Sequence, residues 1–316
     1  MITKGQGKTA RQSRQINIVL SHSEPSGSHE PSAQFNGRNM AFHGNFSEVL
    51  KELDEMVGLD NVKELIYEIY ALLQVEQYRT EAGLLNQPQV FHMIFRGNPG
   101  TGKTTVARII AKMLHKLGVL GKGHFIEVER ADLVGEYIGH TALKTRELVK
   151  KSLGGILFID EAYSLARGGE KDFGKEAIDT LVKAMEDYKN QFVLILAGYC
   201  DEMEDFLQTN PGLPSRFPIQ LDFQDYSIDQ LIQIAELMIK EREYSFVLQT
   251  VIKLRQHIIQ EQNRSCDPFN NARYVRNLIE QSIRHQAVRL LNQFPASPSK
   301  QELMIIRPED LRIARK

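Results

Sequence analysis

The stretch Gly97-Asn98-Pro99-Gly100-Thr101-Gly102-Lys103-Thr104 decides the fold of this chain. It has the spacing Gly-x-x-x-x-Gly-Lys-Thr, and it lies between an apolar run at residues 91–95, which predicts a strand, and a helical pattern at residues 106–117. A strand, a glycine-rich loop and a helix in this order are specific for a phosphate-binding loop. The glycines allow backbone N–H groups to wrap around phosphate oxygens, and the helix N-terminus adds positive partial charge. We expect Lys103 to reach the β- and γ-phosphates of a nucleoside triphosphate and the Thr104 hydroxyl to ligate Mg²⁺.

Two acidic residues follow a second apolar run further along the chain. The run Ile156–Ile159 predicts a buried strand, and Asp160 and Glu161 come directly after it. At the tip of such a strand, Asp160 is placed to hold the Mg²⁺ shell and Glu161 to polarise the attacking water as a general base. An ordinary strand end can also carry Asp-Glu, and it is the phosphate-binding loop upstream that favours the catalytic interpretation.

The remaining apolar pattern predicts an α/β fold with two structured domains. Phe125–Val128 and residues 192–197 are further strand candidates, and helical segments separate the strands. Strands that alternate with helices indicate a parallel sheet with crossover helices. After about residue 225 the strand pattern nearly stops, and helical stripes of apolar residues follow. We therefore expect a large α/β domain at residues 46–225 and a small helical domain at residues 226–316.

The two ends of the chain carry their own expectations. Residues 1–45 are rich in Ser, Gly, Gln, Asn and His, which predicts a mostly disordered tail. This tail is either simply solvated or an arm for localisation or partner binding. Near the other end, residues 304–306 predict a short strand, and a last helix is expected to start near Pro308.

Length and composition exclude several other classes of protein. A chain of 316 residues, of which 42% are hydrophobic, fits about two domains with a sizeable core. The formal net charge of -1 gives no general indication of binding to nucleic acid or to a membrane surface. Cys200 and Cys266 are far apart and have no CxxC partner, so neither a disulfide framework nor a zinc site is expected. No apolar run approaches the ~18 residues of a membrane span, so we expect a cytoplasmic protein without membrane insertion.

Taken together, these motifs resemble those of the AAA+ ATPase superfamily over roughly residues 46–316. The resemblance implies an AAA+ P-loop NTPase sheet domain followed by a small α-helical lid domain, with ATP and Mg²⁺ as cofactors. Met56-Val57-Gly58-Leu59 resembles the segment that holds the adenine, although a break between two core helices is an alternative interpretation. The nucleotide contacts that we expect are Val57, Gly58, Asn98, Pro99, Gly100, Thr101, Gly102, Lys103, Thr104, Thr105, Asp160 and Arg273.

Two arginines resemble those that complete the site in this superfamily. The stretch Asn210-Pro211-Gly212-Leu213-Pro214-Ser215-Arg216-Phe217 resembles the element with the arginine finger, so Arg216 is expected to reach the γ-phosphate of a neighbouring subunit. Asn271-Ala272-Arg273 resembles the second-sensor motif of the lid, in which Arg273 would touch the γ-phosphate within its own subunit, with Arg276 as the second choice. The alternatives are a surface arginine after a turn and, for the lid, a helix-capping asparagine with solvated arginines.

The first sensor departs from the pattern of the superfamily. It is usually an Asn, Thr or Ser at the tip of the strand before the finger, but this chain has Ala197-Gly198-Tyr199-Cys200-Asp201 there. Either Tyr199 or a main-chain group substitutes, or another residue positions the water. The sequence leaves this role open.

A glycine-flanked loop between the two phosphate motifs indicates how the energy of ATP is used. Tyr137, Ile138 and Gly139 resemble the aromatic–hydrophobic–Gly pore loop of AAA+ machines that thread a polypeptide. The Tyr137 ring offers a broad apolar face without sequence selectivity. Packing of Tyr137 on the domain surface is the alternative.

One subfamily resembles this chain in the combination of its motifs. It contains the red-type rubisco activases and the stage V sporulation protein K of spore-forming bacteria, and the N-terminal tail and the helix at residues 62–73 favour the sporulation protein. The motifs concerned are the phosphate-binding loop, Asp160-Glu161-Ala162-Tyr163, Leu196-Ala197-Gly198-Tyr199, Asn210-Pro211-Gly212-Leu213 and Asn271-Ala272-Arg273-Tyr274-Val275-Arg276-Asn277.

The resemblance implies a ring-forming, sporulation-related homo-oligomer, with six subunits as in the superfamily, that remodels a protein partner by pore-loop threading. A remodeller of the rubisco activase type is one alternative. A nucleic-acid-directed motor would need a basic pore lining or an added DNA-binding domain, whereas Asp132 and Glu136 are acidic. An ATP-dependent assembly scaffold would not need Glu161 and Arg216, whose presence argues against it.

Overall fold

The strand that precedes the phosphate-binding loop lies inside a parallel sheet. The computed structural model describes residues 47–86, 89–137, 139–167, 173–264, 268–294 and 297–312, all within one compact unit. In these residues the large sheet has five strands in the order β2-β3-β4-β1-β5, and every neighbouring pair is parallel. The predicted N-terminal tail at residues 1–45 lies outside the described residues.

Four of the five strands stand where the apolar runs predicted them, and the parallel α/β fold is confirmed. The fifth, β5, was not predicted, because only one of its faces is buried and Gln220 and Asp222 interrupt the apolar run. An edge strand of this kind lacks the continuous apolar run of a strand buried on both faces. The strands are β1 (Met93–Gly97), β2 (Phe125–Val128), β3 (Ile156–Ile159), β4 (Val193–Gly198) and β5 (Ile219–Phe223).

The order of the strands brings the two phosphate motifs together. β4 lies between β3 and β1, with Ile195 paired to Met93 on one side and to Phe158 on the other. Because all three strands are parallel, their carboxyl ends meet at one edge of the sheet, where ligands bind in open α/β sheets. The phosphate-binding loop after β1, the tip of β4 and Asp160 after β3 therefore leave the sheet at the same edge.

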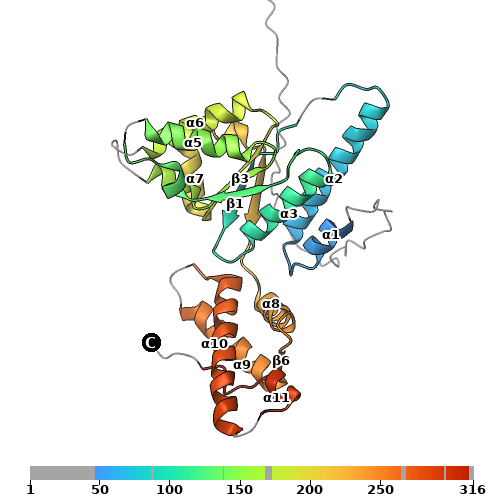
Figure 1. The fold of residues 1–316 in the computed structure, drawn as a ribbon, viewed down its shortest axis with the longest axis vertical. Helices are drawn as coiled ribbons and strands as arrows, with labels where there is room; N and C mark the ends of the chain where they lie inside the picture. The colour runs from blue at the N-terminus through green and yellow to red at the C-terminus, as the bar shows by residue number, and fades with distance from the viewer. Residues whose placement is uncertain are drawn as a thin grey trace, which may run out of the picture. The chain divides into compact units, whose positions relative to one another are not determined.

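Helices cover the two faces of the sheet, and Figure 1 shows α1–α3 on one side and α5–α7 on the other. Met93 and Phe95 of β1 belong to the core with α3, whereas Ile94 belongs to the core with α6. The predicted break at Gly58 separates α1 from α2. The helices of this part are α1 (Ser47–Asp54), α2 (Asp60–Glu81), α3 (Lys103–Lys116), α4 (Arg130–Leu133), α5 (His140–Ser152), α6 (Gly174–Asp187) and α7 (Cys200–Gln208), with 3-10 turns η2 (Ala162–Ala166) and η3 (Pro214–Arg216).

The chain after β5 is helical, as expected. Its elements are α8 (Ile228–Lys240), α9 (Leu248–Arg264), α10 (Asn271–Gln293) and α11 (Lys300–Met304), with a small parallel pair of strands, β6 (Ser245–Phe246) and β7 (Ile305–Ile306). β7 confirms the strand predicted at residues 304–306. Neither these helices nor the others in the described part of the chain combine the length and the apolar character needed to cross a membrane.

The last predicted helix is wrong within the described residues. The chain forms a turn at residues 308–310. The buried Asp310 carboxylate accepts hydrogen bonds from the Arg289 side chain at 2.8 and 3.0 Å and from Arg307 N at 2.8 Å. These bonds hold the segment against α10, so the local tendency of the sequence to form a helix is overridden by a buried ion pair.

Candidate functional site

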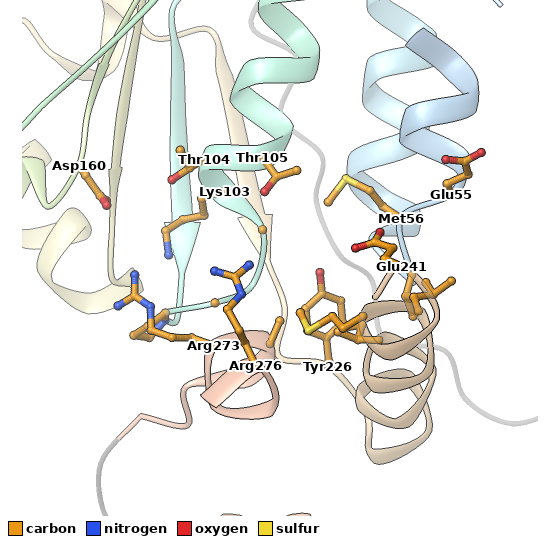
Figure 2. A pocket seen from close by; sticks show the side chains of 18 of the residues that line it. Glu55, Met56, Lys103, Thr104, Thr105, Asp160, Tyr226, Glu241, Arg273 and Arg276 are labelled. Carbon is orange, nitrogen blue, oxygen red and sulfur yellow. The ribbon is translucent and has the colours of Figure 1, made fainter. Parts of the chain in front are cut away.

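A cavity of about 780 Å³ lies between the phosphate-binding loop and the start of α10. Figure 2 shows Lys103 and Asp160 on one side and the side chains of Arg273 and Arg276 extending toward them from the other. Glu161, the predicted general base, lines the same cavity. The predicted nucleotide-binding residues that line it are Val57, Pro99, Gly100, Gly102, Lys103, Thr104, Thr105, Asp160 and Arg273.

Three predicted nucleotide contacts, Gly58, Asn98 and Thr101, are not among the residues that line the cavity. A side chain on Gly58 would come within 2.5 Å of Gln230 Nε2 on α8, so this glycine permits close packing of α8. The Asn98 side chain donates to Asp225. Thr101 is fully buried, and its hydroxyl donates to the Asn98 carbonyl at 2.8 Å. Asn98 and Thr101 thus hold the loop in place, whereas Gly58 allows α8 to pack closely.

The phosphate-binding loop holds its lysine at the first residue of α3. Lys103 Nζ donates to the carbonyls of Gly97 at 2.6 Å and Asn98 at 2.8 Å. Burial lowers the pKa of Lys103, and the nearby Asp160 carboxylate opposes that effect. An anionic phosphate would compete with the two carbonyls for the ammonium group and favour its charged form. The loop can therefore exchange an internal contact of Lys103 for a contact with phosphate.

The oxygen atoms around Lys103 fit a magnesium ion. Thr104 and Asp160 line one cavity, and Asp160 Oδ1 accepts a hydrogen bond from Glu161 N at 3.0 Å. Mg²⁺ is usually bound by one or two carboxylates or hydroxyls together with waters and substrate phosphates, rather than by a cage of protein ligands. The described residues contain no group of three or more His, Cys, Asp or Glu that could hold a metal by themselves.

Glu161 occupies an unusual backbone conformation. Its φ of 47° and ψ of 45° lie in the left-handed region, which residues other than glycine seldom adopt. The residue stands between β3 and η2, so the sharp turn leaves its side chain exposed at the cavity. Conformations of this kind gather at active sites, where the surrounding structure holds them. The geometry is suited to a group that acts on a water molecule in the cavity.

The start of α10 contributes two arginines and an anchor that the sequence did not predict. Arg273 and Arg276 lie one helical turn apart and both line the cavity. Asn271 is the first residue of the helix and not its cap, and its side chain is fully buried. Its Nδ2 donates to Asp225 Oδ1 at 2.7 Å, and its Oδ1 accepts from Tyr226 N at 3.0 Å. Asp225 and Tyr226 belong to none of the motifs that we singled out, so the sequence analysis did not indicate them.

Tyr226 connects the link between the two parts of the chain to the phosphate-binding loop. Its hydroxyl donates to the Thr101 carbonyl at 3.1 Å, and its ring lines the cavity. Burial raises the pKa of Tyr226 to about 12, so the hydroxyl keeps its proton and remains a donor.

The tip of β4 faces the cavity without a polar Asn or Thr. Gly198 and Tyr199 line it, and the Tyr199 ring lies 5.7 Å from the ring of Tyr163. A side chain on Gly198 would come within 2.7 Å of Tyr163 Cδ1 and 2.8 Å of Met203. The strand tip is therefore closely packed, and Tyr199 is the residue there whose side chain can carry a hydroxyl to the site.

The far end of the cavity carries a group of apolar side chains, beside the charged residues Glu55, Glu241 and Arg242. Met56 and Val57 precede α2, and three residues of α8 lie opposite them, namely Ile234, Leu237 and Met238. Such a surface suits the faces of a purine ring. Of residues 56–59, which were expected to hold the adenine, Met56 and Val57 line the cavity, and the contribution of α8 was not predicted.

Arg216 does not line the cavity of its own chain. It ends η3, where its guanidinium donates to the Gly212 carbonyl at 2.8 Å and forms a short ion pair with Glu186 of α6. Asn210 supports the same element, because its Nδ2 donates to Asp179 Oδ1 at 3.2 Å and its Oδ1 accepts from Gly212 N at 2.9 Å. The arginine is thus held at the surface on α6, apart from the phosphate-binding loop.

Tyr137 also lies away from the cavity. Its side chain is 65% exposed, and its ring stands edge-on to His140 at 5.4 Å. Gly139 then takes a φ of 81° just before α5 begins. Ile138, the middle residue of the predicted pore loop, lies outside the described residues.

The fold and the site define the class of protein. The sequence profile of the "ATPase family associated with various cellular activities (AAA)" matches residues 93–225, and that of the "AAA lid domain" matches residues 227–316. A RuvB variant from Thermotoga maritima shares the fold, with a TM-score of 0.53 at 20% identity over 82% of this chain and 69% of that chain. The chain belongs to the AAA+ ATPases.

Two curated relatives define the branch of that family. The chain is 54% identical to the "Stage V sporulation protein K" of Bacillus subtilis over 96% of both chains. It is 46% identical to the "Protein CbbX" of Cereibacter sphaeroides over 85% of this chain and 87% of the relative. The resemblance to this AAA+ subfamily, inferred from the motifs, is confirmed.

Proposed function

We propose that this ATPase depends on Mg²⁺ and acts as a closed homo-oligomer, with six subunits, that remodels a protein partner by pulling on it with the Tyr137 loops. The observation that carries the proposal is that the predicted catalytic residues lie in two separate places. Lys103, Asp160, Glu161 and Arg273 share one cavity, whereas Arg216 lies at the surface outside it. The proposal includes three parts of the chain: a tail at residues 1–45, a nucleotide-binding α/β domain at residues 46–225 and a helical lid domain at residues 226–316.

Within one subunit, the residues of the cavity have distinct roles. The backbone of the phosphate-binding loop and Lys103 bind the β- and γ-phosphates, and Thr104 and Asp160 would hold Mg²⁺, which neutralises phosphate charge when bound. Glu161 accepts a proton from the water that attacks the γ-phosphorus, and the bond to the β-γ bridging oxygen breaks to give ADP and phosphate. Arg273, or Arg276 beside it, stabilises the γ-phosphate oxygens.

The position of Arg216 supports the oligomer. An arginine that stabilises the transition state must touch the γ-phosphate, and Arg216 is held on α6 instead. A head-to-tail contact that closes into a ring would bring it to the cavity of a second copy. The contact with the Gly212 carbonyl would then orient the finger at that interface, where the exposed ion pair with Glu186 can be exchanged for a contact with phosphate.

The exposed Tyr137 supports action on a polypeptide. An aromatic ring that is 65% exposed on a loop before α5 can grip extended chain of any sequence. The identity to a stage V sporulation protein supports a role in sporulation, and a cytoplasmic location is part of the proposal. A remodeller of the rubisco activase type remains the alternative. The acidic Asp132 and Glu136 beside the loop disfavour a nucleic-acid motor.

A substrate trap tests the whole proposal. The Glu161→Gln variant should bind ATP with Mg²⁺, hydrolyse it at least about 100-fold more slowly, and retain its protein partner in a pull-down. The matched control is Lys103→Ala/Glu161→Gln, which should not bind ATP and should capture nothing. Undiminished hydrolysis by Glu161→Gln would remove Glu161 from the role of base, and recovery of nucleic acid alone would contradict protein remodelling.

A second variant tests the threading step on its own. Tyr137→Ala should lose most of the stimulation of ATP hydrolysis by the captured partner, because the gripping ring is gone. Leu143→Ala, which removes another exposed apolar side chain nearby on α5, is the matched control. Unchanged stimulation in Tyr137→Ala would exclude threading by this loop.

A further inference from the structure

Three side chains behind the phosphate-binding loop join that loop to the lid. The Asp225 carboxylate accepts hydrogen bonds from Asn98 Nδ2 at 3.0 and 2.9 Å, and from Asn271 Nδ2 at 2.7 Å. We call Asn98, Asp225 and Asn271 the relay cluster. Asn98 belongs to the phosphate-binding loop, Asp225 to the link after β5, and Asn271 to α10. One carboxylate thus contacts both moving parts of the proposed machine.

Asn271 is the buried member of the relay cluster. It is 0% exposed, and its Nδ2 also donates to the Phe269 carbonyl at 2.9 Å while its Oδ1 accepts from Tyr226 N at 3.0 Å. A buried amide whose donors and acceptor are all engaged fixes the segments around it, because the loss of one partner leaves another unsatisfied. Asn271 therefore sets where α10 begins.

The backbone at Asn271 aims the arginines. Its φ of 42° is positive, a conformation that asparagine adopts more readily than most residues. Arg273 follows two residues later and Arg276 one turn further on, and both line the nucleotide cavity. The direction of these side chains thus depends on the conformation that the Asn271 side chain holds.

The loop side of the relay cluster is bonded to the catalytic lysine. The Asn98 carbonyl accepts from Lys103 Nζ at 2.8 Å and from Thr101 Oγ1 at 2.8 Å. A phosphate that attracts Lys103 Nζ competes with this carbonyl, so phosphate binding alters the bonding of the residue whose side chain holds Asp225. The bonds between Asn98 and Asp225 are exposed, so they can exchange with water at modest cost, whereas the bond from Asp225 to the buried Asn271 cannot.

We propose that Asp225 and Asn271 are positioning residues that transmit phosphate binding at Lys103 to the lid and thereby orient Arg273. The inference rests on the proposed ATPase function and adds the regulation of that site. A shift of Asn98 changes its hydrogen bonds to the Asp225 carboxylate. That carboxylate then shifts its hydrogen bond to Asn271, and the movement of Asn271 reorients the first turn of α10. If the cluster did not transmit phosphate binding, its hydrogen bonds would only hold α10 in one fixed position.

Hydrogen exchange tests the relay without requiring hydrolysis. In the full chain, a non-hydrolysable ATP analogue with Mg²⁺ should slow amide exchange at residues 274–280 of wild type. Asn271→Gly removes the side chain and still permits the positive φ, and Asp225→Ala removes the central acceptor while leaving the sequence of α10 intact. We expect both variants to bind the analogue within about tenfold of wild type but to lose the response of α10. Wild-type responses in both variants would overturn the proposal.

A neighbouring residue provides the matched control. Asn270 is exposed and makes no side-chain cap bond, so Asn270→Gly introduces the same glycine one residue away. This variant should keep the wild-type response of residues 274–280. If Asn270→Gly lost the response as Asn271→Gly did, backbone flexibility rather than the relay would explain the effect.

Kinetics then test whether Asn271 acts through Arg273. We expect Asn271→Gly to lower kcat about tenfold in the wild-type background and less than about twofold in an Arg273→Ala background. Equal losses in the two backgrounds would contradict an action through Arg273. If the chain bound nucleotide without hydrolysing it, this test would fail together with the proposed function, while the exchange experiment would still report on the relay.

Discussion

The junction between the phosphate-binding loop and the lid differs sharply from the surface that carries Arg216. At the junction, the fully buried Asn271 and Thr101 bond to backbone and side chains within 3.0 Å. At the other surface, the side chains of Arg216 and Glu186 are 27% and 61% exposed. Exposed ion pairs contribute about 0–1 kcal/mol, whereas leaving a buried polar group without a partner costs about 1–3 kcal/mol.

This difference separates the residues that are proposed to act within one chain from the residue that is proposed to act on a second chain. Groups that act within one chain are fixed by the fold before any partner arrives. A group that must act on a second chain is held by a contact that water already weakens, so an interface can replace it at little cost.

The largest expected effect is that of Arg216→Ala. We expect hydrolysis by the assembled protein to fall about 10³-fold or more, because the proposed arginine finger is lost, while ATP binding stays within about tenfold. Steady-state ATPase assays and nucleotide titrations measure the two effects. Arg108→Ala, which removes another exposed arginine from a surface ion pair, is the control.

Mixing two inactive variants shows whether Arg216 acts on a neighbour. Subunits with Arg216→Ala retain Glu161, and subunits with Glu161→Gln retain Arg216, so a mixture of the two in the proposed ring would contain complete sites. The mixture should therefore hydrolyse ATP faster than either variant alone. Activity no higher than the sum of the two would contradict a shared site.

A buried histidine below the finger element should make stability depend on pH. His92 lies 6.1 Å from the ring of Phe217, its Nδ1 accepts from Leu194 N at 2.9 Å, and its Nε2 has no hydrogen-bond partner among the described residues. Burial lowers the pKa of His92 to about 4, from 6.5. The unfolded chain thus binds the proton more tightly, so the free energy of unfolding should decrease by up to ~3 kcal/mol as pH falls from about 6.5 to 4.

His92→Asn isolates this contribution. Asparagine can still accept from Leu194 N but does not titrate, so the variant should be less stable near neutral pH and flatter between pH 6.5 and 4. Urea denaturation at a series of pH values measures the difference from wild type. A profile parallel to that of wild type would show that His92 does not cause the pH dependence.

The smallest expected effect is that of Glu186→Gln. This variant removes a surface ion pair, so the free energy of unfolding should change by less than about 1 kcal/mol. Asn271→Gly should cost more, because it removes buried hydrogen bonds. Equal losses of stability in thermal or urea denaturation would break the contrast between the two regions.

The sequence predicted those parts of the site whose chemistry is local. The phosphate-binding loop follows an apolar strand with a specific spacing, and its presence favoured the catalytic interpretation of Asp160 and Glu161, which follow a later apolar strand. β5 was missed because its polar outer face hides the strand pattern. The relay cluster was missed because the Asp225–Asn271 bond joins residues 46 positions apart, and only the folded chain brings them together.

The position of Gly100 limits which residues the phosphate-binding motif can contain. A side chain there would meet the Asn270 carbonyl at 2.4 Å and Arg273 N at 2.7 Å, and its φ of 71° is already positive. These atoms belong to the lid and not to a phosphate. A larger residue would push α10 away from the phosphate-binding loop. The lid as well as the nucleotide therefore restricts which residue can occupy this position of the motif.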